Sequence, residues 1–349
     1  MRLRIFDYFR GLAILLIVAG HSYGPWIAES FTEKMLANLI SGGTVLFVFM
    51  SGFFFYYIFY PQFDYCGFMA KKTKQVFLPY SFLSLLAFVS LVLCFETPPF
   101  PEVFIPEPLT ECWQYVGLCL QYLWTGALMS SYWYVPFIMM IFILSPAFIW
   151  QIKLPFRVQA ILIVFLLAVS SIVHRPVDNL SPLHSLLYFF PVYMLGIVCA
   201  INKEQVLCFI KNKSIILGLL VLGLSALQIL VYKEYGNFHK DSLLSYQGID
   251  TMLFQKIALC FFILSVLQKF ENKNLPFLEF TGSVSFAIYF LHPWVIYLIE
   301  SFPIYDNLAF IPGFTLFMVN FTVVILSSIL LAYGIKKVFR GRSRFLIGW

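Results

Sequence analysis

Apolar segments long enough to cross a membrane recur from one end of the chain to the other. A helix needs about 20 mostly apolar residues to span the hydrocarbon layer, and helices satisfy their own backbone hydrogen bonds there. The composition agrees, since 61% of the residues are hydrophobic and 11% are charged. The sequence therefore predicts an all-α polytopic membrane protein, a bundle of about ten transmembrane helices. The expected spans are residues 11–27, 39–60, 76–95, 132–150, 158–173, 186–201, 214–232, 251–268, 281–300 and 313–335.

The segments between these spans are short. We therefore expect one transmembrane domain over residues 1–349, with no appended soluble domain. Residues 115–129 are only half apolar and predict an interfacial or re-entrant helix. The first span also resembles a signal peptide, but it contains His21 and no small-residue cleavage site follows cleanly, so we expect it to be retained.

The charges of the connecting segments alternate between the two predicted sides. One side is rich in cations and the other carries few of them, together with the acidic loop 96–111. By the positive-inside rule the cation-rich side is cytoplasmic, and both termini lie there. The net charge of +6 therefore reflects topology, and no nucleic-acid partner is expected. The cation-rich side carries Arg2, Arg4, Arg10, Lys71, Lys72, Lys74, Lys153, Arg157, Lys203, Lys211, Lys213, Lys269, Lys273, Lys336, Lys337, Arg340, Arg342 and Arg344, and the other carries Lys34, Arg175, Lys233 and Lys240.

Arg10 and His21 stand at the two ends of the first apolar run. Eleven steps of α-helix make about three full turns and rise about 16 Å, so the two side chains share one face. If Arg10 marks the membrane surface, the imidazole of His21 lies near the middle of the hydrocarbon layer, where an ionisable group indicates function. The alternative is an imidazole that only bonds a neighbouring helix.

A second polar group lies in the ninth predicted span. Ser285, Tyr289 and His292 are spaced i, i+4 and i+7, so they form one stripe on a helix. Such polar side chains often only form hydrogen bonds between neighbouring helices. Three of them aligned with a histidine favour a polar-lined cavity.

The second span contains small residues near both ends, in SGGTVLFVFMSGF, which predicts close helix packing. A lysine cluster then precedes the third span, at Lys71, Lys72 and Lys74. Such a cluster is a topology signal, a contact for anionic lipid, or a site for the phosphates of a soluble ligand. Lys256, inside the eighth span, either extends to the membrane interface or belongs to a site.

Several of these segments resemble the acyltransferase 3 family of membrane proteins. DYFRGLAILLIVAGHS is similar to the family's first span, and SGGTVLFVFMSGFFF to its second. KKTKQVFLPY resembles the basic segment before the third span, although the family usually has arginines where this chain has lysines and Gln75. YWYVPFIMMIFILSP, YFFPVYMLGI and VSFAIYFLHPW resemble later blocks, in the same order.

The resemblance implies acyl transfer from a cytoplasmic acyl-CoA, usually acetyl-CoA, to a hydroxyl of a lipid-linked or exported glycan. It implies a multi-pass protein of a bacterial cytoplasmic (inner) membrane, in contact with membrane lipid and without a metal. His21 would be the base or the acyl carrier, and Arg10 would bind the donor. The other expected residues are Lys71, Lys72 and Lys74 for the donor, and Ser285, Tyr289, His292, Trp133 and Tyr134 for the acceptor or the oxyanion. For Trp133 and Tyr134 an aromatic belt is the alternative.

Two other functions are compatible with a bundle of this kind. A proton-coupled transporter or exporter would also use a buried histidine, but it should show internal repeats, and the two halves show none. A non-catalytic scaffold would leave the polar stripe unexplained. The acceptor, the acyl length, the oligomeric state and the division of roles between His21 and His292 stay open at this stage.

Overall fold

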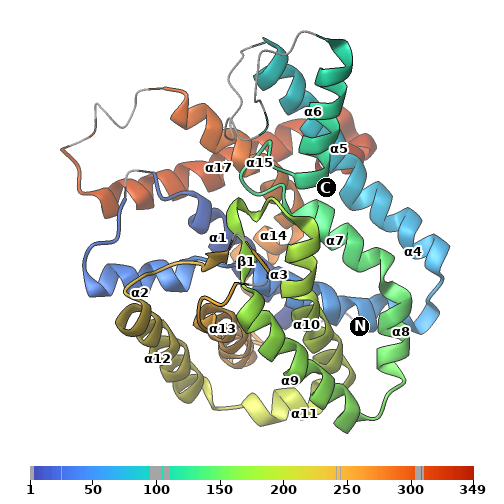
Figure 1. The fold of residues 1–349 in the computed structure, drawn as a ribbon, viewed down its shortest axis with the longest axis vertical. Coiled ribbons are helices and arrows are strands. Elements are labelled where there is room, and N and C mark those ends of the chain that lie inside the picture. Colours follow the sequence, from blue (N-terminus) through green and yellow to red (C-terminus); the bar gives the residue numbers. More distant parts are fainter. Residues whose placement is uncertain are drawn as a thin grey trace.

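A computed structural model describes residues 4–349 of the chain except 25, 95–103, 105–110, 241, 244, 303–307 and 309. Most of the predicted acidic loop 96–111 therefore lies outside the described residues. The rest is built almost wholly from helices (Figure 1). They are α1 (Arg4–His21), α2 (Phe31–Ile40), α3 (Thr44–Phe54), α4 (Tyr65–Lys72), α5 (Leu78–Ala87), α6 (Cys112–Thr125), α7 (Tyr134–Ile143), α8 (Ser145–Ile152), α9 (Phe156–Val173), α10 (Pro182–Ile201), α11 (Lys203–Ile210), α12 (Ser214–Tyr232), α13 (Thr251–Gln268), α14 (Pro276–Ser283), α15 (Ser285–Glu300), α17 (Gly313–Phe339) and α18 (Ser343–Ile347).

Short irregular elements connect or extend these helices. One parallel pairing joins two dipeptides, β1 (Arg175–Pro176) and β2 (His239–Lys240). The π- and 3₁₀-helical segments are η1 (Phe55–Phe59), η2 (Tyr60–Gln62), η3 (Thr73–Phe77), η4 (Phe88–Cys94), η6 (Val177–Asn179) and η7 (Arg340–Arg342). Several of them continue an α-helix, so η1 and η2 extend α3.

The described residues contain seven helical segments long and apolar enough to cross a membrane, or nine if each of two bent pairs counts as one span. This confirms the predicted all-α polytopic membrane fold. Two predicted spans, 214–232 and 251–268, coincide with α12 and α13. Helix α1 is not among the nine, because its 18 residues include Arg4, Asp7 and Arg10. That it crosses the membrane, as a tenth span, stays a prediction.

The predicted spans 132–150 and 281–300 are each broken into two helices. The first bends by 55° between α7 and α8, where Pro146 stands in the first turn of α8. The second bends by 75° between α14 and α15, at Val284. A hydropathy pattern measures the length of an apolar run but not its direction, so neither bend could be predicted from it.

Small residues let the central helices approach each other closely. A Cβ on Gly11 or on Gly282 would collide with the backbone of the opposite helix in the α1–α14 pair. Gly52 and Gly196 play the same part between α3 and α10. The packing predicted for small residues of the second span is therefore present at Gly52, where helix backbones meet without intervening side chains.

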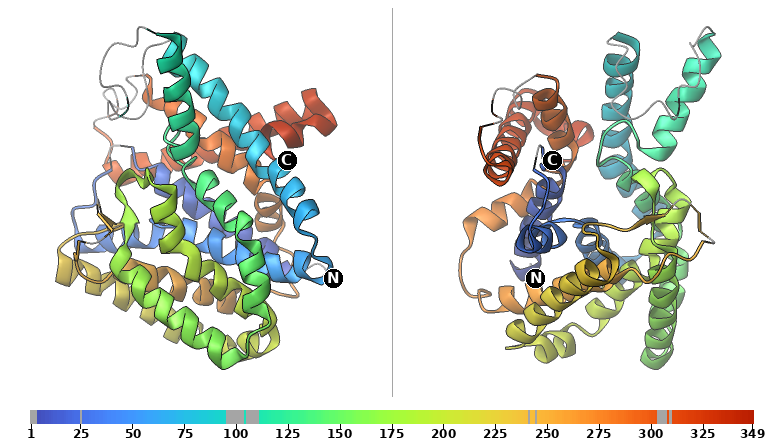
Figure 2. Two further views of the ribbon diagram at one scale, coloured as in Figure 1. Left: turned by 45° about the vertical axis from the view of Figure 1, so that its right-hand side comes forward. Right: turned by 60° about the vertical axis from the view of Figure 1, so that its left-hand side comes forward.

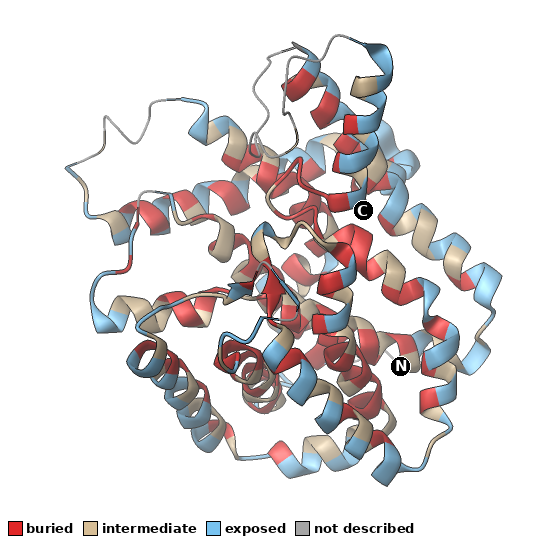
Figure 3. Ribbon diagram, viewed as in Figure 1, coloured by how far each residue is buried: buried red, intermediate tan, exposed pale blue. Residues whose placement is uncertain are grey.

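Burial separates central from peripheral helices (Figure 3). Helices α10 and α13 are mostly buried, whereas α9, α12 and α17 present exposed apolar side chains along much of their length. Helices α5 and α6 extend together from one end of the molecule (Figure 2), and α6 corresponds to the half-apolar segment predicted at 115–129. The exposed apolar faces are those expected to meet lipid, and the polar site lies among the central helices.

Candidate active site

Arg10 and His21 both face the bent pair α14–α15. The guanidinium of Arg10 donates from Nη2 to the Gly282 carbonyl at 2.6 Å and to Ser285 Oγ at 3.1 Å. The imidazole ring of His21 lies 5.5 Å, centre to centre, from the ring of His292. The face predicted for α1 therefore meets the predicted polar stripe of α15. The bend between α14 and α15 leaves Gly282 O at a helix end, where it accepts from Arg10.

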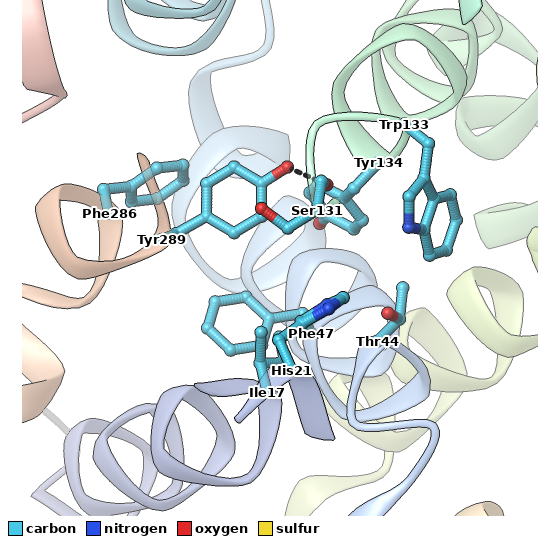
Figure 4. A pocket seen from close by; sticks show the side chains of 9 residues that line it. All are labelled: Ile17, His21, Thr44, Phe47, Ser131, Trp133, Tyr134, Phe286 and Tyr289. Atoms are coloured by element: carbon cyan, nitrogen blue, oxygen red, sulfur yellow. Dashed lines mark hydrogen bonds between the residues drawn. The ribbon is translucent and has the colours of Figure 1, made fainter. Parts of the chain in front are cut away.

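A small cavity of about 20 Å³ lies beside His21, with room for about one water molecule (Figure 4). Tyr289 from α15 donates its hydroxyl to the Ser131 carbonyl at 2.6 Å. The Ser131 hydroxyl is buried and has no hydrogen-bond partner among the described residues. We call this the central cavity; it is lined by Ile17, His21, Thr44, Phe47, Ser131, Trp133, Tyr134, Phe286 and Tyr289.

A second cavity, of about 550 Å³, opens at the Arg10 end of α1. Four cationic side chains line it, and Phe286 lines both it and the central cavity. Lys336 lies with its Nζ 3.5 Å above the ring of Trp349. We call this the basic cavity; it is lined by Arg10, Gln75, Ser283, Phe286, Lys336, Arg340, Gly341, Ser343, Arg344, Gly348 and Trp349.

A third cavity, of about 250 Å³, lies at the His21 end of α1. Its lining is mostly polar, and it shares Ile17, His21, Thr44 and Trp133 with the central cavity. We call this the distal cavity; it is lined by Leu16, Ile17, Gly20, His21, Ile40, Ser41, Gly42, Gly43, Thr44, Ser130, Trp133, Arg175, Asp178, Asn179, Asn237 and His239.

The turn between α2 and α3 forms one wall of the distal cavity. Gly42 has a φ of +77° there, and a Cβ at this position would press on Asn237 and Lys256. Lys256 is buried and donates its Nζ to the carbonyls of Asn38 (2.6 Å) and Leu39 (3.0 Å), near the carboxyl end of α2. Lys256 therefore does not extend to the membrane interface, and it lines none of the three cavities; its cation instead stabilises the carboxyl end of α2, a role that was not expected from the sequence.

The β1–β2 pair forms another wall. Arg175 in β1 is 4% exposed, and its guanidinium carbon lies 5.2 Å from the ring centre of Trp133 and 5.1 Å from that of Phe189. Burial lowers the pKa of Arg175, but an arginine begins so high that it keeps its charge near neutral pH. Its neighbour His174 and the lining residue Asp178 both have positive φ, at 58° and 49°.

The three cavities follow one another along α1, from a basic end through His21 to a polar end. The sequence profile described as "Acyltransferase domain", that of the acyltransferase 3 family, matches residues 3–336. The chain belongs to the acyltransferase 3 family. It is therefore a membrane acyltransferase. No curated protein and no solved structure matches it.

The structure brings together most of the site residues that were expected from the resemblance to the acyltransferase 3 family. His21, Trp133, Tyr134 and Tyr289 all line the central cavity, and Trp133 also lines the distal one. Arg10 lines the basic cavity, and Ser285 binds Arg10. His292 is fully buried and lines none of the three cavities; its Nδ1 donates to the Ile288 carbonyl at 2.9 Å.

The lysine cluster lies elsewhere. Lys72 lies over aromatic rings, with Nζ 4.4 Å from the centre of Phe142 and 4.5 Å from that of Phe59. Lys71 also lies over Phe59, at 5.0 Å. None of Lys71, Lys72 and Lys74 lines the basic cavity, although Gln75 does. The expectation that these lysines join Arg10 is not met by this geometry, because cation–π contacts hold two of them among rings.

Several lining residues were missed from sequence. Three cations were interpreted only as topology signals: Lys336, Arg340 and Arg344. In the folded protein they line the same cavity as Arg10. Ser131 immediately precedes the block YWYVPFIMMIFILSP and was not among the expected site residues. Arg175 had a usable signal, because it is a cation on the side where the positive-inside rule expects few.

Proposed function

We propose that this acyltransferase moves an acyl group, most simply acetyl, from acyl-CoA to a hydroxyl of a cell-surface or lipid-linked glycan. The observation that carries the proposal is the succession of a basic, a central and a distal cavity past one histidine. A donor and an acceptor entering from opposite ends would meet at His21. The charge pattern of the loops supports a cytoplasmic Arg10 end, where acyl-CoA is made available.

The basic cavity suits the phosphates of CoA. Arg10, Lys336, Arg340 and Arg344 supply four cations, and no aspartate or glutamate is among its described lining residues. Arginine offers a planar fork of donors that matches phosphate oxygens. Arg340 and Arg344 are exposed, so they are accessible to a soluble ligand. The acyl end of the donor would then extend past Phe286 toward His21.

In the proposed reaction a nitrogen of His21 takes the proton of the acceptor hydroxyl while that oxygen bonds to the thioester carbonyl carbon. The carbon–sulfur bond then breaks, and the departing sulfur takes the proton from His21. The products are the ester and CoA. In the alternative route His21 carries the acyl group covalently before the hydroxyl attacks.

A hydroxyl that lines the central cavity is available to a developing oxyanion. The Ser131 hydroxyl lines this cavity and has no partner in the described part of the chain, so it can donate to a negatively charged oxygen. Tyr289 is held by its bond to the Ser131 carbonyl and shapes the wall. The ring of His292 lies 5.5 Å, centre to centre, from that of His21. We propose that His292 positions the His21 imidazole.

Acetyl-CoA binding by the purified full chain in lipid nanodiscs tests the donor site. Arg344→Gln should weaken binding roughly tenfold or more, because a hydrogen bond to a charged group is lost. Arg157→Gln makes the same change at an exposed arginine of α9 outside the basic cavity and should leave binding unchanged. Lys74→Gln tests the lysine cluster.

Three results would count against this assignment. Loss of binding in Lys74→Gln with full binding in Arg344→Gln would move the CoA phosphates to the lysine cluster. An equal loss in Arg157→Gln would mean that the effect is nonspecific. A folded wild type that binds neither acetyl-CoA nor longer acyl-CoAs would favour the transporter.

A further inference from the structure

The distal cavity contains an arginine, Arg175, with two donor nitrogens that have no hydrogen-bond partner among the described residues. These nitrogens are Nε and Nη2, and both are buried. The whole residue is 4% exposed, yet it lines a cavity of about 250 Å³. Buried donors of a charged group are normally satisfied, because leaving them unpaired is costly.

The guanidinium is held in place without using those donors. It lies over the rings of Trp133 and Phe189, and its own backbone N–H donates to the Phe238 carbonyl at 3.4 Å. These cation–π contacts hold the guanidinium, while Nε and Nη2 on one of its edges stay available for two-point hydrogen bonding. This is the arrangement that recognises a carboxylate or a phosphate.

The nearby acidic side chains form no ion pair with Arg175 in the described part of the chain, although Asp250 lies close enough to stabilise the charge of the guanidinium electrostatically. Both carboxylate oxygens of Asp250 are engaged, one by the Tyr188 hydroxyl at 2.7 Å and the other by the Leu253 N–H at 3.1 Å. Asp178 lines the same cavity but forms no ion pair with Arg175 in the described part of the chain.

The other cations near this cavity are occupied. Lys240 donates to the Ile172 carbonyl at 2.9 Å, and Lys256 to two carbonyls near the end of α2. Neither lines the distal cavity, and Arg175 is the one arginine or lysine among its described lining residues. The described lining of the distal cavity therefore holds one arginine and one carboxylate, that of Asp178, in contrast to the four cations of the basic cavity.

We infer that the distal cavity receives an acidic sugar, and that Arg175 binds its carboxylate or phosphate. The inference rests on the proposed function, in which the acceptor reaches His21 from this side. The rest of the lining includes neutral polar groups suited to sugar hydroxyls, among them Ser41, Asn179 and Asn237, together with the carboxylate of Asp178 and apolar side chains. The enzyme would thus select acceptors by charge and not only by the presence of a hydroxyl.

Direct binding of small probe sugars tests the inference. The probes are methyl β-glucuronide, glucose 6-phosphate and the neutral methyl β-glucoside, titrated against the full chain in nanodiscs. The wild type should bind an anionic probe roughly tenfold or more tighter than the neutral one. Arg175→Gln should abolish that preference, Arg175→Lys should restore only part of it, and Arg157→Gln, on an exposed site outside this cavity, should retain it. Comparison of the two anions distinguishes a carboxylate site from a phosphate site.

Acetyl-CoA binding, measured on the same samples, keeps the two proposals separate. The inference is wrong if the wild type binds acetyl-CoA but shows no preference for either anionic sugar. It is also wrong if Arg175→Gln, still binding acetyl-CoA, keeps the preference. If the anionic sugars bind through Arg175 but no acyl-CoA binds, the anion site stands and the proposed acyl-CoA-dependent transfer fails.

Discussion

The two ends of the cavity series differ in how they hold positive charge. The basic cavity has four cations, two of them on the exposed segment that follows α17. The distal cavity has one, which is buried and stacked on aromatic rings. Several exposed cations suit a ligand with many phosphate charges, whereas one rigid guanidinium suits a single anionic group. The difference indicates that each end is made for a different substrate.

The central cavity separates these ends, and in the proposed mechanism the acyl group is transferred there. This predicts that changes there alter the rate of transfer while leaving both binding sites intact. Changes at an end should instead alter the affinity for one substrate only.

Replacing His21 should have the largest effect. His21→Gln removes the proposed base and should lower the rate of acetyl transfer by roughly 100- to 10,000-fold. Binding of acetyl-CoA and of the acidic sugar should persist. His184→Gln provides a control, since His184 is a buried histidine outside the three cavities. Transfer at the wild-type rate by folded His21→Gln would remove His21 from the mechanism.

Ser131→Ala should come next, with a rate lower by roughly 100-fold if its hydroxyl stabilises the oxyanion. Ser145→Ala is a matched control, because the Ser145 hydroxyl is also buried without a partner among the described residues but lines none of the three cavities. Steady-state kinetics should show the loss in kcat. A loss confined to KM would assign Ser131 to substrate binding.

Salt should distinguish the two ends. Exposed charges are screened as ionic strength rises, while buried charges are screened much less. Raising KCl from 50 to 500 mM should weaken acetyl-CoA binding several-fold and methyl β-glucuronide binding by about twofold at most. Equal salt dependence at both ends would contradict the contrast drawn between them.

Phe47→Ala should have the smallest effect. Phe47 lines the central cavity, so its removal makes room for a longer acyl chain. Transfer of propionyl, which is one methylene longer than acetyl, should rise by roughly fourfold relative to acetyl. Phe165→Ala, on the exposed face of α9, should leave the ratio unchanged. An unchanged ratio in Phe47→Ala would mean that another wall limits the acyl chain.

Helix geometry explains which parts of the site could be predicted. Helical spacing places Arg10 and His21 on one face of α1, and Ser285 and Tyr289 on one face of α15. In the structure these two faces are directed toward each other. The fold class and the family were also predictable, because long apolar runs and ordered blocks depend only on the sequence.

The cavities depended on tertiary contacts and could not be predicted. Nothing local indicates that η7 and α18 bring Arg340 and Arg344 to Arg10, or that β1 pairs with β2 and carries Arg175 to Trp133. The 75° bend at Val284 is likewise set by packing against α1, where Gly11 and Gly282 meet.

The small size of the central cavity has an electrical consequence. An open file of water through a membrane protein would let protons run down the transmembrane potential, which is worth about 2.3 kcal/mol per charge at 100 mV. At about 20 Å³ the passage beside His21 accommodates about one water molecule, between Phe47, Phe286 and Tyr289. If acyl transfer takes place beside His21 as proposed, the aromatic side chains that line this cavity also limit the water, and therefore the protons, that can pass along α1.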